Sequence, residues 1–338
     1  MLDKRKLIPL GVVIILLLFW KFQQDRRLEN YQLLTGRTMG PIAYNIKYLD
    51  SDERNYQLEV DSLLQAFNQS LSTYIPSSEI SRFNSSDRFE FESGYFFPVL
   101  QLSKTIHQLT GGAFDPTVGP LVNAWGFGPG EKRTIDSLNI DSLKALVGFE
   151  KVSFDKSQVS KAVEGLQLDF SAIAKGYAVD VVGEFLEARG VNDYMVEIGG
   201  EVRCRGQNPE GKTWRIGIEE PTLEEEERGL FATVILEERS LATSGNYRNF
   251  YELDGKKYVH TISPFTGEPV QHSLLSASVF SKSCITADAL ATGFMVLGLE
   301  RSLEIVNQLD SVDAYFIYAD DEGELQTMAT EGIEKMVR

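Results

Sequence analysis

Hydrophobic and polar positions along the chain follow two spacings, one typical of helices and one typical of strands. Apolar residues three to four apart over residues 60–71 predict an amphipathic helix that ends before Pro76. A second helix is predicted from about Pro98 to Leu109, where two glycines stop it, and further helices over 174–188 and 285–297. Runs that alternate or are continuously apolar predict strands over residues 41–50, 166–170, 194–206, 213–221, 232–238, 276–281 and 313–320.

The order of these elements indicates the fold class. Strands and helices mix without a regular strand–helix–strand rhythm, which favours an α+β fold over a doubly wound sheet. The length of 338 residues is enough for one large domain or two intimately packed ones. The acidic run at 223–228 is expected to be an exposed loop.

The N-terminal segment has the pattern of a membrane-targeting signal. Lys4, Arg5 and Lys6 precede an apolar run from Leu7 to Trp20, and no small-residue cleavage site follows. We expect residues 1–22 to be an uncleaved signal anchor, with a cleaved signal as the alternative, and residues 23–35 to be a juxtamembrane spacer. Since basic flanks stay in the cytoplasm, the rest of the chain is expected on the periplasmic side of the inner (cytoplasmic) membrane.

Charge and cysteine content narrow the function classes. A net charge of −16 disfavours nucleic acid and anionic lipid headgroups as partners, because an acidic surface repels both. A phosphorylated ligand would need local positive charge from a metal, a helix N-terminus or basic side chains. Cys204 and Cys284 match no zinc spacing and are expected to be buried thiols.

Two segments carry candidate phosphate and metal chemistry. In ITADALATG (285–293), Asp288 and Thr292 share one helix face and form an oxygen pair suited to Mg²⁺; alternatively, they are an exposed aspartate and a core threonine. In LDFSAIAKGYAVD (168–180), a helix start follows a strand and favours an anion. Lys175 is either a phosphate contact or a solvated lysine, and the small Ala172 would let its carbonyl approach a metal.

Two further segments carry candidate ring-binding and acid–base chemistry. The Gly- and Pro-rich stretch at 111–130 is a shaped loop in which Phe114 and Asp115 suit a flat polar ring, or else a rigid structural turn. In the segment 240–270, Arg248 is a phosphate-type donor and His260 is the natural base for a hydroxyl, or else a structural imidazole. His107 and His272 look incidental. Dinucleotide, P-loop, serine-hydrolase and HExxH motifs are missing from the sequence.

Seven motifs in order resemble the ApbE family, the FAD:protein FMN transferases, over roughly residues 35–320. They are TGRTMG (35–40), LSTY (71–74) with SEISRFN (78–84), GGAFDPTVGPLVNAWGFG, DFSAIAKGYAVD, IGGEVRCRG, ATSGNYRNFYELDGKKYVHTISPFTG and ADALATGFMVLG. The resemblance implies a catalytic domain over residues 36–330, made of two intimately packed T-fold-type sub-domains with FAD in the cleft between them.

The resemblance also assigns roles to single residues. It implies that Asp288, Thr292 and the Ala172 carbonyl hold Mg²⁺. His260 is the candidate base, on chemistry as much as on resemblance, and Asp288 is the second catalytic candidate. The implied FAD contacts are Met39, Tyr74, Ala113, Phe114, Asp115, Asp169, Lys175 and Ile262.

The expected activity is Mg²⁺-dependent transfer of FMN from FAD to a Thr or Ser hydroxyl of an acceptor protein, with release of AMP. Family members suggest that the acceptor is a subunit of a membrane electron-transfer or ion-pumping complex. The alternatives are a pyrophosphatase that uses water as acceptor, giving FMN and AMP, and a flavin-binding protein without turnover.

Overall fold

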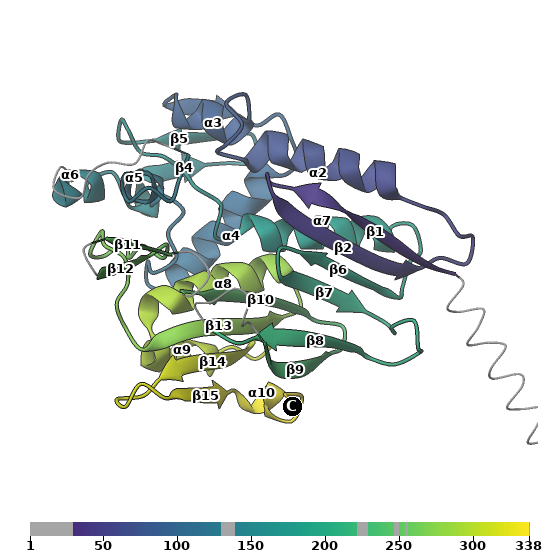
Figure 1. Cartoon of the computed structure of the whole chain (residues 1–338). Coiled ribbons are helices and arrows are strands. Elements are labelled where there is room, and N and C mark those ends of the chain that lie inside the picture. The colour runs from purple at the N-terminus through teal and green to yellow at the C-terminus, as the bar shows by residue number, and fades with distance from the viewer. Residues whose placement is uncertain (1–29, 130–138, 222–228, 247–249, 254–255, 338) are drawn as a thin grey trace, which may run out of the picture.

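An eight-stranded antiparallel sheet forms the centre of the molecule (Figure 1). The computed structural model describes residues 30–129, 139–221, 229–246, 250–253 and 256–337. In spatial order the strands are β1 (Tyr31–Thr38), β2 (Ile42–Leu49), β6 (Tyr194–Ile198), β7 (Glu201–Arg205), β10 (Ser240–Gly245), β13 (Leu274–Ser281), β14 (Asp313–Ala319) and β15 (Leu325–Ala329).

The sheet has two halves that repeat one pattern, in which helices are inserted between a second and a third strand. Between β2 and β6 the chain forms α2 (Gln57–Leu71), α3 (Glu79–Asn84), α4 (Phe96–Leu109), α5 (Gly119–Ala124), α6 (Ile140–Lys144) and α7 (Ala174–Glu187). Between β13 and β14 it forms α8 (Cys284–Leu297) and α9 (Leu299–Val306). The halves meet where β7 pairs with β10, through Ser240 opposite Arg203 and Leu241 opposite Val202.

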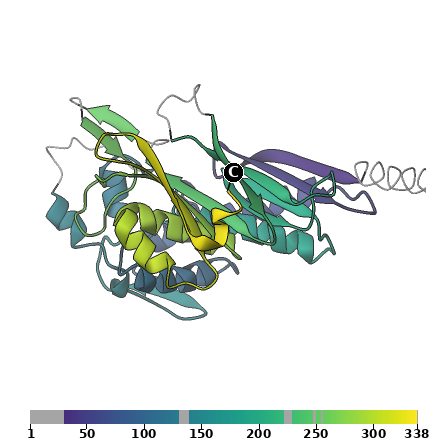
Figure 2. The same cartoon turned by 90° about the horizontal axis from the view of Figure 1, so that it is seen from below.

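The two faces of the sheet are covered differently (Figure 2). Helices α7 and α8 pack on one face within the larger hydrophobic core. The hairpin of β8 (Trp214–Glu219) and β9 (Leu230–Leu236), with α10 (Glu331–Glu334), covers part of the other face over a second core. Because side chains alternate along a strand, Val202 and Cys204 of β7 enter this second core, while Glu201 and Arg203 reach α7.

Smaller elements surround this framework. A three-stranded sheet contains β3 (Arg88–Glu90), β5 (Gln158–Lys161) and β4 (Val152–Phe154), and the short 3₁₀ helix η2 (Phe149–Lys151) leads into β4. A separate hairpin is formed by β11 (Phe250–Leu253) and β12 (Lys256–Val259).

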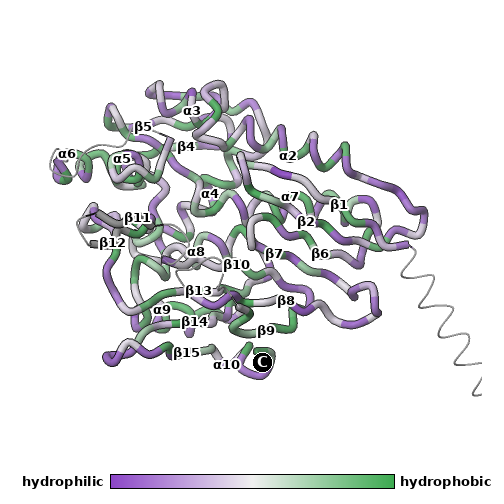
Figure 3. Tube along the Cα trace, viewed as in Figure 1, coloured by the Kyte–Doolittle hydropathy of each residue, from purple (hydrophilic) through white to green (hydrophobic). Residues whose placement is uncertain are grey.

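Helix α8 is the most buried helix of the core. Ten of its fourteen residues are buried, and Figure 3 shows hydrophobic residues along it and along the strands beneath it. The Ser283 side chain begins the helix by accepting a hydrogen bond from the Thr286 amide, and Gly298 ends it with φ 79°. The polar side chain of Asp288, which is buried on this helix, is therefore fixed by its surroundings.

The structure confirms the α+β class and most of the predicted elements. The helices expected over 98–109, 174–188 and 285–297 correspond to α4, α7 and α8 within one or two residues. The strand expected over 166–170 is wrong. Leu166, Leu168 and Phe170 are buried as the alternation indicates, but the Leu168 backbone bonds with the Asn84 side-chain amide rather than with a neighbouring strand.

The N-terminal expectations have two outcomes. Residues 31–35, expected in the spacer, belong to β1 and pair with β2, so the ordered sheet begins earlier than the sequence pattern indicates. The expected anchor at 1–22, the acidic loop at 223–228 and Arg248 lie outside the described residues. Across the ranges that the structure describes, no helix has both the length and the apolar character needed to cross a bilayer.

Replacing Gly176 with alanine is expected to destabilise the fold by about 1–3 kcal/mol, because a Cβ there would lie 2.3 Å from the Cys284 carbonyl oxygen and 2.7 Å from the Asp288 Cβ. The matched control is Gly94→Ala, where a Cβ meets no atom within 4 Å. Urea unfolding of both variants measures the difference. Equal midpoints for the two variants would contradict the close approach of α7 and α8.

Candidate functional site

The N-terminal ends of α7 and α8 meet at one point of the core. The Gly176 amide of α7 donates a hydrogen bond of 2.8 Å to Oδ2 of Asp288 on α8. Asp288 is only 2% exposed, so this bond fixes the direction of its carboxylate. Only glycine at position 176 lets the two helices approach this closely.

Lys175 lies between two carboxylates at this junction. Its ammonium pairs with Oε1 of Glu201, on β7, and lies 3.8 Å from Oδ1 of Asp288. Burial alone would lower the pKa of Lys175, but Asp288 and Glu201 together outweigh it and raise the pKa above the usual value. Lys175 is therefore a charged group held by acidic neighbours, not a solvated surface lysine.

Glu201 is a buried carboxylate outside the set of predicted site residues. Burial raises its pKa to about 7, against the opposing effect of Lys175. Within the described part of the chain its Oε2 has no hydrogen-bond partner. The sequence feature that could have indicated Glu201 is its position directly after Gly199 and Gly200, in the strand predicted over residues 194–206. Its partner Lys175 is distant in sequence, so the ion pair could not be predicted.

The residues predicted to hold a metal lie on α8 or directly before α7. Thr292 follows Asp288 by one helical turn, and its hydroxyl lies 3.1 Å from the Ser244 hydroxyl of β10. Ala172 precedes the first turn of α7. Among the described residues, no group of three or more His, Cys, Asp or Glu side chains is arranged to hold a metal. One carboxylate, one hydroxyl and one carbonyl fit Mg²⁺, which keeps waters and binds substrate phosphates.

The loop after α4 packs against α8 and is shaped by Asp115. Its Oδ1 accepts hydrogen bonds from the amide and hydroxyl of Thr117, and its Oδ2 accepts one of 3.2 Å from the Phe149 amide. Burial raises the pKa of Asp115, although these hydrogen bonds oppose the shift. Both carboxylate oxygens thus bond within the protein, so the side chain holds the loop in shape.

Two neighbours complete this loop. Phe114 and Ala113 are buried, and Phe114 lies against α8 beside Gly293. Nδ1 of His107 lies 3.0 Å from the Phe114 carbonyl oxygen. His107, expected to be incidental, therefore supports the loop.

Asp169 links this loop to the start of α7. Its amide donates to the Pro116 carbonyl at 2.7 Å, and its Oδ1 accepts from the Ser171 amide at 2.8 Å. Partial burial and the negative charge of Asp169 raise the pKa of Tyr74. Tyr74 is nevertheless 66% exposed, so its ring is open to solvent.

A second group of predicted residues meets around Phe127. The Tyr74 hydroxyl lies 3.5 Å from the Phe127 carbonyl oxygen, and the rings of Phe127 and His260 are 6.4 Å apart in an edge-to-face arrangement. Ile262 packs in a small core with Leu121 and Trp125. His260, Tyr74 and Ile262 thus lie around the 118–127 segment.

Met39 lies at the tip of the β1–β2 hairpin. It has a positive φ of 49°, which is uncommon for a residue other than glycine. Further along this hairpin, Ile42 approaches Gly199, and Gly199 in turn approaches the Lys175 side chain. The hairpin end therefore borders the Lys175 neighbourhood.

The chain is similar to known proteins along most of its length. The ApbE family model matches residues 39–316. The chain is 41% identical over 299 residues to the FAD:protein FMN transferase of Vibrio cholerae, covering 86% of this chain and 88% of the relative. It is also 41% identical to the protein of that name from Haemophilus influenzae, over 306 residues, 86% of this chain and 87% of the relative.

Solved structures show the same fold. The flavin transferase ApbE from Vibrio cholerae superposes with a TM-score of 0.81 and 38% identity, over 90% of this chain and 99% of that one. The apo form of the Pseudomonas stutzeri flavinyl transferase ApbE gives a TM-score of 0.80 and 36% identity, over 90% and 96% of the two chains. Because the family model matches residues 39–316 and a relative is 41% identical over 86% of the chain, this chain belongs to the ApbE family.

Proposed function

We propose that this protein is an FAD:protein FMN transferase, which moves FMN from FAD to a Thr or Ser hydroxyl of an acceptor protein and releases AMP. The observation that carries the proposal is the 41% identity to transferases of that name over 86% of the chain. The junction of Lys175, Glu201 and Asp288 supports it, because a cation and a buried carboxylate there suit a phosphorylated substrate and its metal.

Asp288, Thr292 and the Ala172 carbonyl are proposed to hold Mg²⁺. Bound there, Mg²⁺ would supply charge neutralisation for the FAD pyrophosphate. Lys175 adds a fixed positive charge beside this site. In a protein of net charge −16, such local cations allow an anionic ligand to bind.

His260 is proposed to accept the proton of the acceptor hydroxyl on a ring nitrogen. The deprotonated oxygen then attacks the phosphorus on the FMN side of the pyrophosphate, the bond to the AMP phosphate breaks, and AMP leaves. His260 suits this role because it is half-buried beside Phe127, with Tyr74 exposed nearby. A protein hydroxyl can therefore approach from solvent.

FAD is proposed to bind between two T-fold-type sub-domains, which correspond to the two repeated halves of the sheet. The pattern of two strands, helices and two strands in each half supports this division. Residues from both halves meet at the α7–α8 junction. The proposed FAD contacts are Met39, Tyr74, Ala113, Phe114, Asp115, Asp169, Lys175 and Ile262.

The remaining proposals concern location and partner. Residues 1–22 are proposed to anchor the protein in the inner membrane, with the catalytic domain on the periplasmic side. Their basic flank and apolar run support this. The acceptor is proposed to be a membrane electron-transfer or ion-pumping subunit with a flavinylated Thr or Ser.

Co-expression with candidate acceptor subunits, followed by mass spectrometry, tests the transferase activity. We expect an FMN adduct on a Thr or Ser of the acceptor, and AMP release that depends on the acceptor when FAD and Mg²⁺ are supplied in vitro. Equal AMP release without acceptor would identify a pyrophosphatase instead. Bound FAD without AMP release under either condition would identify a flavin-binding protein.

A further inference from the structure

Helices α7 and α8 cap each other through two buried aspartates. Asp180 of α7 accepts a hydrogen bond of 2.9 Å on Oδ2 from the Ile285 amide, in the first turn of α8. Asp288 of α8 accepts the corresponding bond from the Gly176 amide, in the first turn of α7. Amides in a first turn have no partner inside their own helix. Each helix therefore supplies a carboxylate that accepts a hydrogen bond from an amide in the first turn of the other helix.

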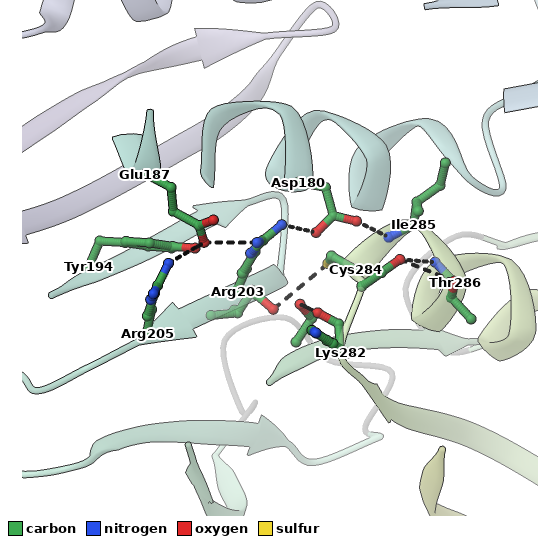
Figure 4. Close-up of polar contacts among 12 residues, drawn as sticks. Asp180, Glu187, Tyr194, Arg203, Arg205, Lys282, Cys284, Ile285 and Thr286 are labelled. Carbon is green, nitrogen blue, oxygen red and sulfur yellow. Dashed lines mark hydrogen bonds and ion pairs between the residues drawn. The ribbon is translucent and has the colours of Figure 1, made fainter. Parts of the chain in front are cut away.

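Arg203 holds the Asp180 carboxylate from its other side (Figure 4). Its Nη1 lies 2.9 Å from Oδ1 of Asp180, and its Nη2 lies 2.9 Å from Oε1 of Glu187. Asp180 is 4% exposed, and both of its carboxylate oxygens are bonded. Glu187, seven residues further along α7, binds the same arginine and accepts a hydrogen bond from the Tyr194 hydroxyl (Figure 4).

These contacts fix where the start of α8 lies relative to α7. One oxygen of Asp288 is already bonded to Gly176, and the other faces Lys175 at 3.8 Å. Thr292 lies one turn further along α8, whereas Ala172 precedes α7. A shift of α8 along α7 would move the side-chain oxygens of Asp288 and Thr292 relative to the carbonyl of Ala172, which precedes α7.

We propose that Asp180, oriented by Arg203, is a positioning residue that holds the α8 metal-binding oxygens in register with the start of α7. The inference rests on the proposed function, since it assigns Asp180 to the Mg²⁺ site of that reaction. Asp180 itself is not among the proposed metal ligands or FAD contacts.

Asp180→Asn tests this role with little change in shape. The asparagine must turn its NH₂ group either to Arg203 or to the Ile285 amide, so a donor faces a donor and one link is lost. We expect the Mg²⁺ concentration for half-maximal FMN transfer to rise about 10- to 100-fold, with turnover at saturating Mg²⁺ within about twofold of wild type. Without Mg²⁺ or FAD, amides in the first turn of α8 should exchange hydrogen faster.

Glu187→Gln is the matched control, because it weakens the same arginine's pairing but leaves the link to α8. We expect its Mg²⁺ requirement and its α8 exchange to match wild type. Equal behaviour of Asp180→Asn and wild type would overturn the proposal. Equal shifts in both variants would also overturn it, since they would reflect general loss of stability.

Two further measurements keep the test decisive. If Asp180→Asn does not fold, Asp180→Glu retains the charge but displaces it by one methylene, and the same shift in Mg²⁺ requirement is expected. If wild type shows no FMN transfer, the proposed function fails. The positioning role is then still decided by α8 exchange and by the Mg²⁺ dependence of FAD binding, measured from flavin fluorescence.

Discussion

Asp288→Asn is expected to reduce FMN transfer by about 1000-fold while the protein remains folded. Asparagine retains an oxygen that can accept the Gly176 amide, so the α7–α8 contact survives. The substitution removes the charge of the single carboxylate in the proposed oxygen set, and losing about 4 kcal/mol of stabilisation corresponds to that factor. Transfer assays over a range of Mg²⁺ concentrations, with thermal unfolding in parallel, measure both effects.

The control for this variant is Asp321→Asn, which removes one negative charge from an exposed turn. It is expected to leave both transfer and unfolding near wild type. Transfer by Asp288→Asn within about tenfold of wild type, with an unchanged Mg²⁺ requirement, would refute the proposed metal site.

His260→Ala is expected to lower FMN transfer by about 100- to 10,000-fold, the usual contribution of a positioned general base. FAD binding, measured by flavin fluorescence, should change little, because the proposed base acts on the acceptor hydroxyl. Added imidazole should restore part of the rate by occupying the space beside Phe127. This rescue distinguishes a base from a histidine that only supports its loop.

His272→Ala is the matched histidine control. Nε2 of His272 lies 2.8 Å from the Met295 carbonyl oxygen near the end of α8, so it has a structural partner. We expect a modest loss of stability and near-normal transfer. A His260→Ala variant with lowered stability, near-normal transfer and no response to imidazole would show that His260 is structural.

The sequence predicted the helices of the core well because local spacing reports burial directly. α8 was located within one residue because an apolar segment of helical length begins after Ser283 and ends at Gly298. The same signal failed at residues 166–170. Apolar and polar residues alternate there as in a strand, but Asp169 is buried as well as Leu168 and Phe170, and the partner of the Leu168 backbone is Asn84, 84 residues away. Alternation of apolar and polar residues does not report what the backbone bonds to.

The sequence indicates which residues have side chains suited to the chemistry, but it does not indicate their hydrogen-bond and ion-pair partners. Asp115 was selected from its loop, but its bond to the Phe149 amide depends on a contact across 34 residues. Glu201 was missed because a carboxylate gains significance only when the fold places Lys175 against it. The sequence pattern does not separate edge strand β1 from the spacer, because several residues of β1 are solvent-exposed and its apolar pattern is weak.

The division of the sheet into two halves has a consequence for any split form of this protein. The halves are consecutive in the chain, and their strands pair at β7 and β10 through two residue pairs. Lys175 and Glu201 belong to the first half, whereas Asp288, Thr292 and His260 follow β10 in the chain. A chain cut between β7 and β10 would thus leave two fragments that each lack part of the site, and activity would require their complementation.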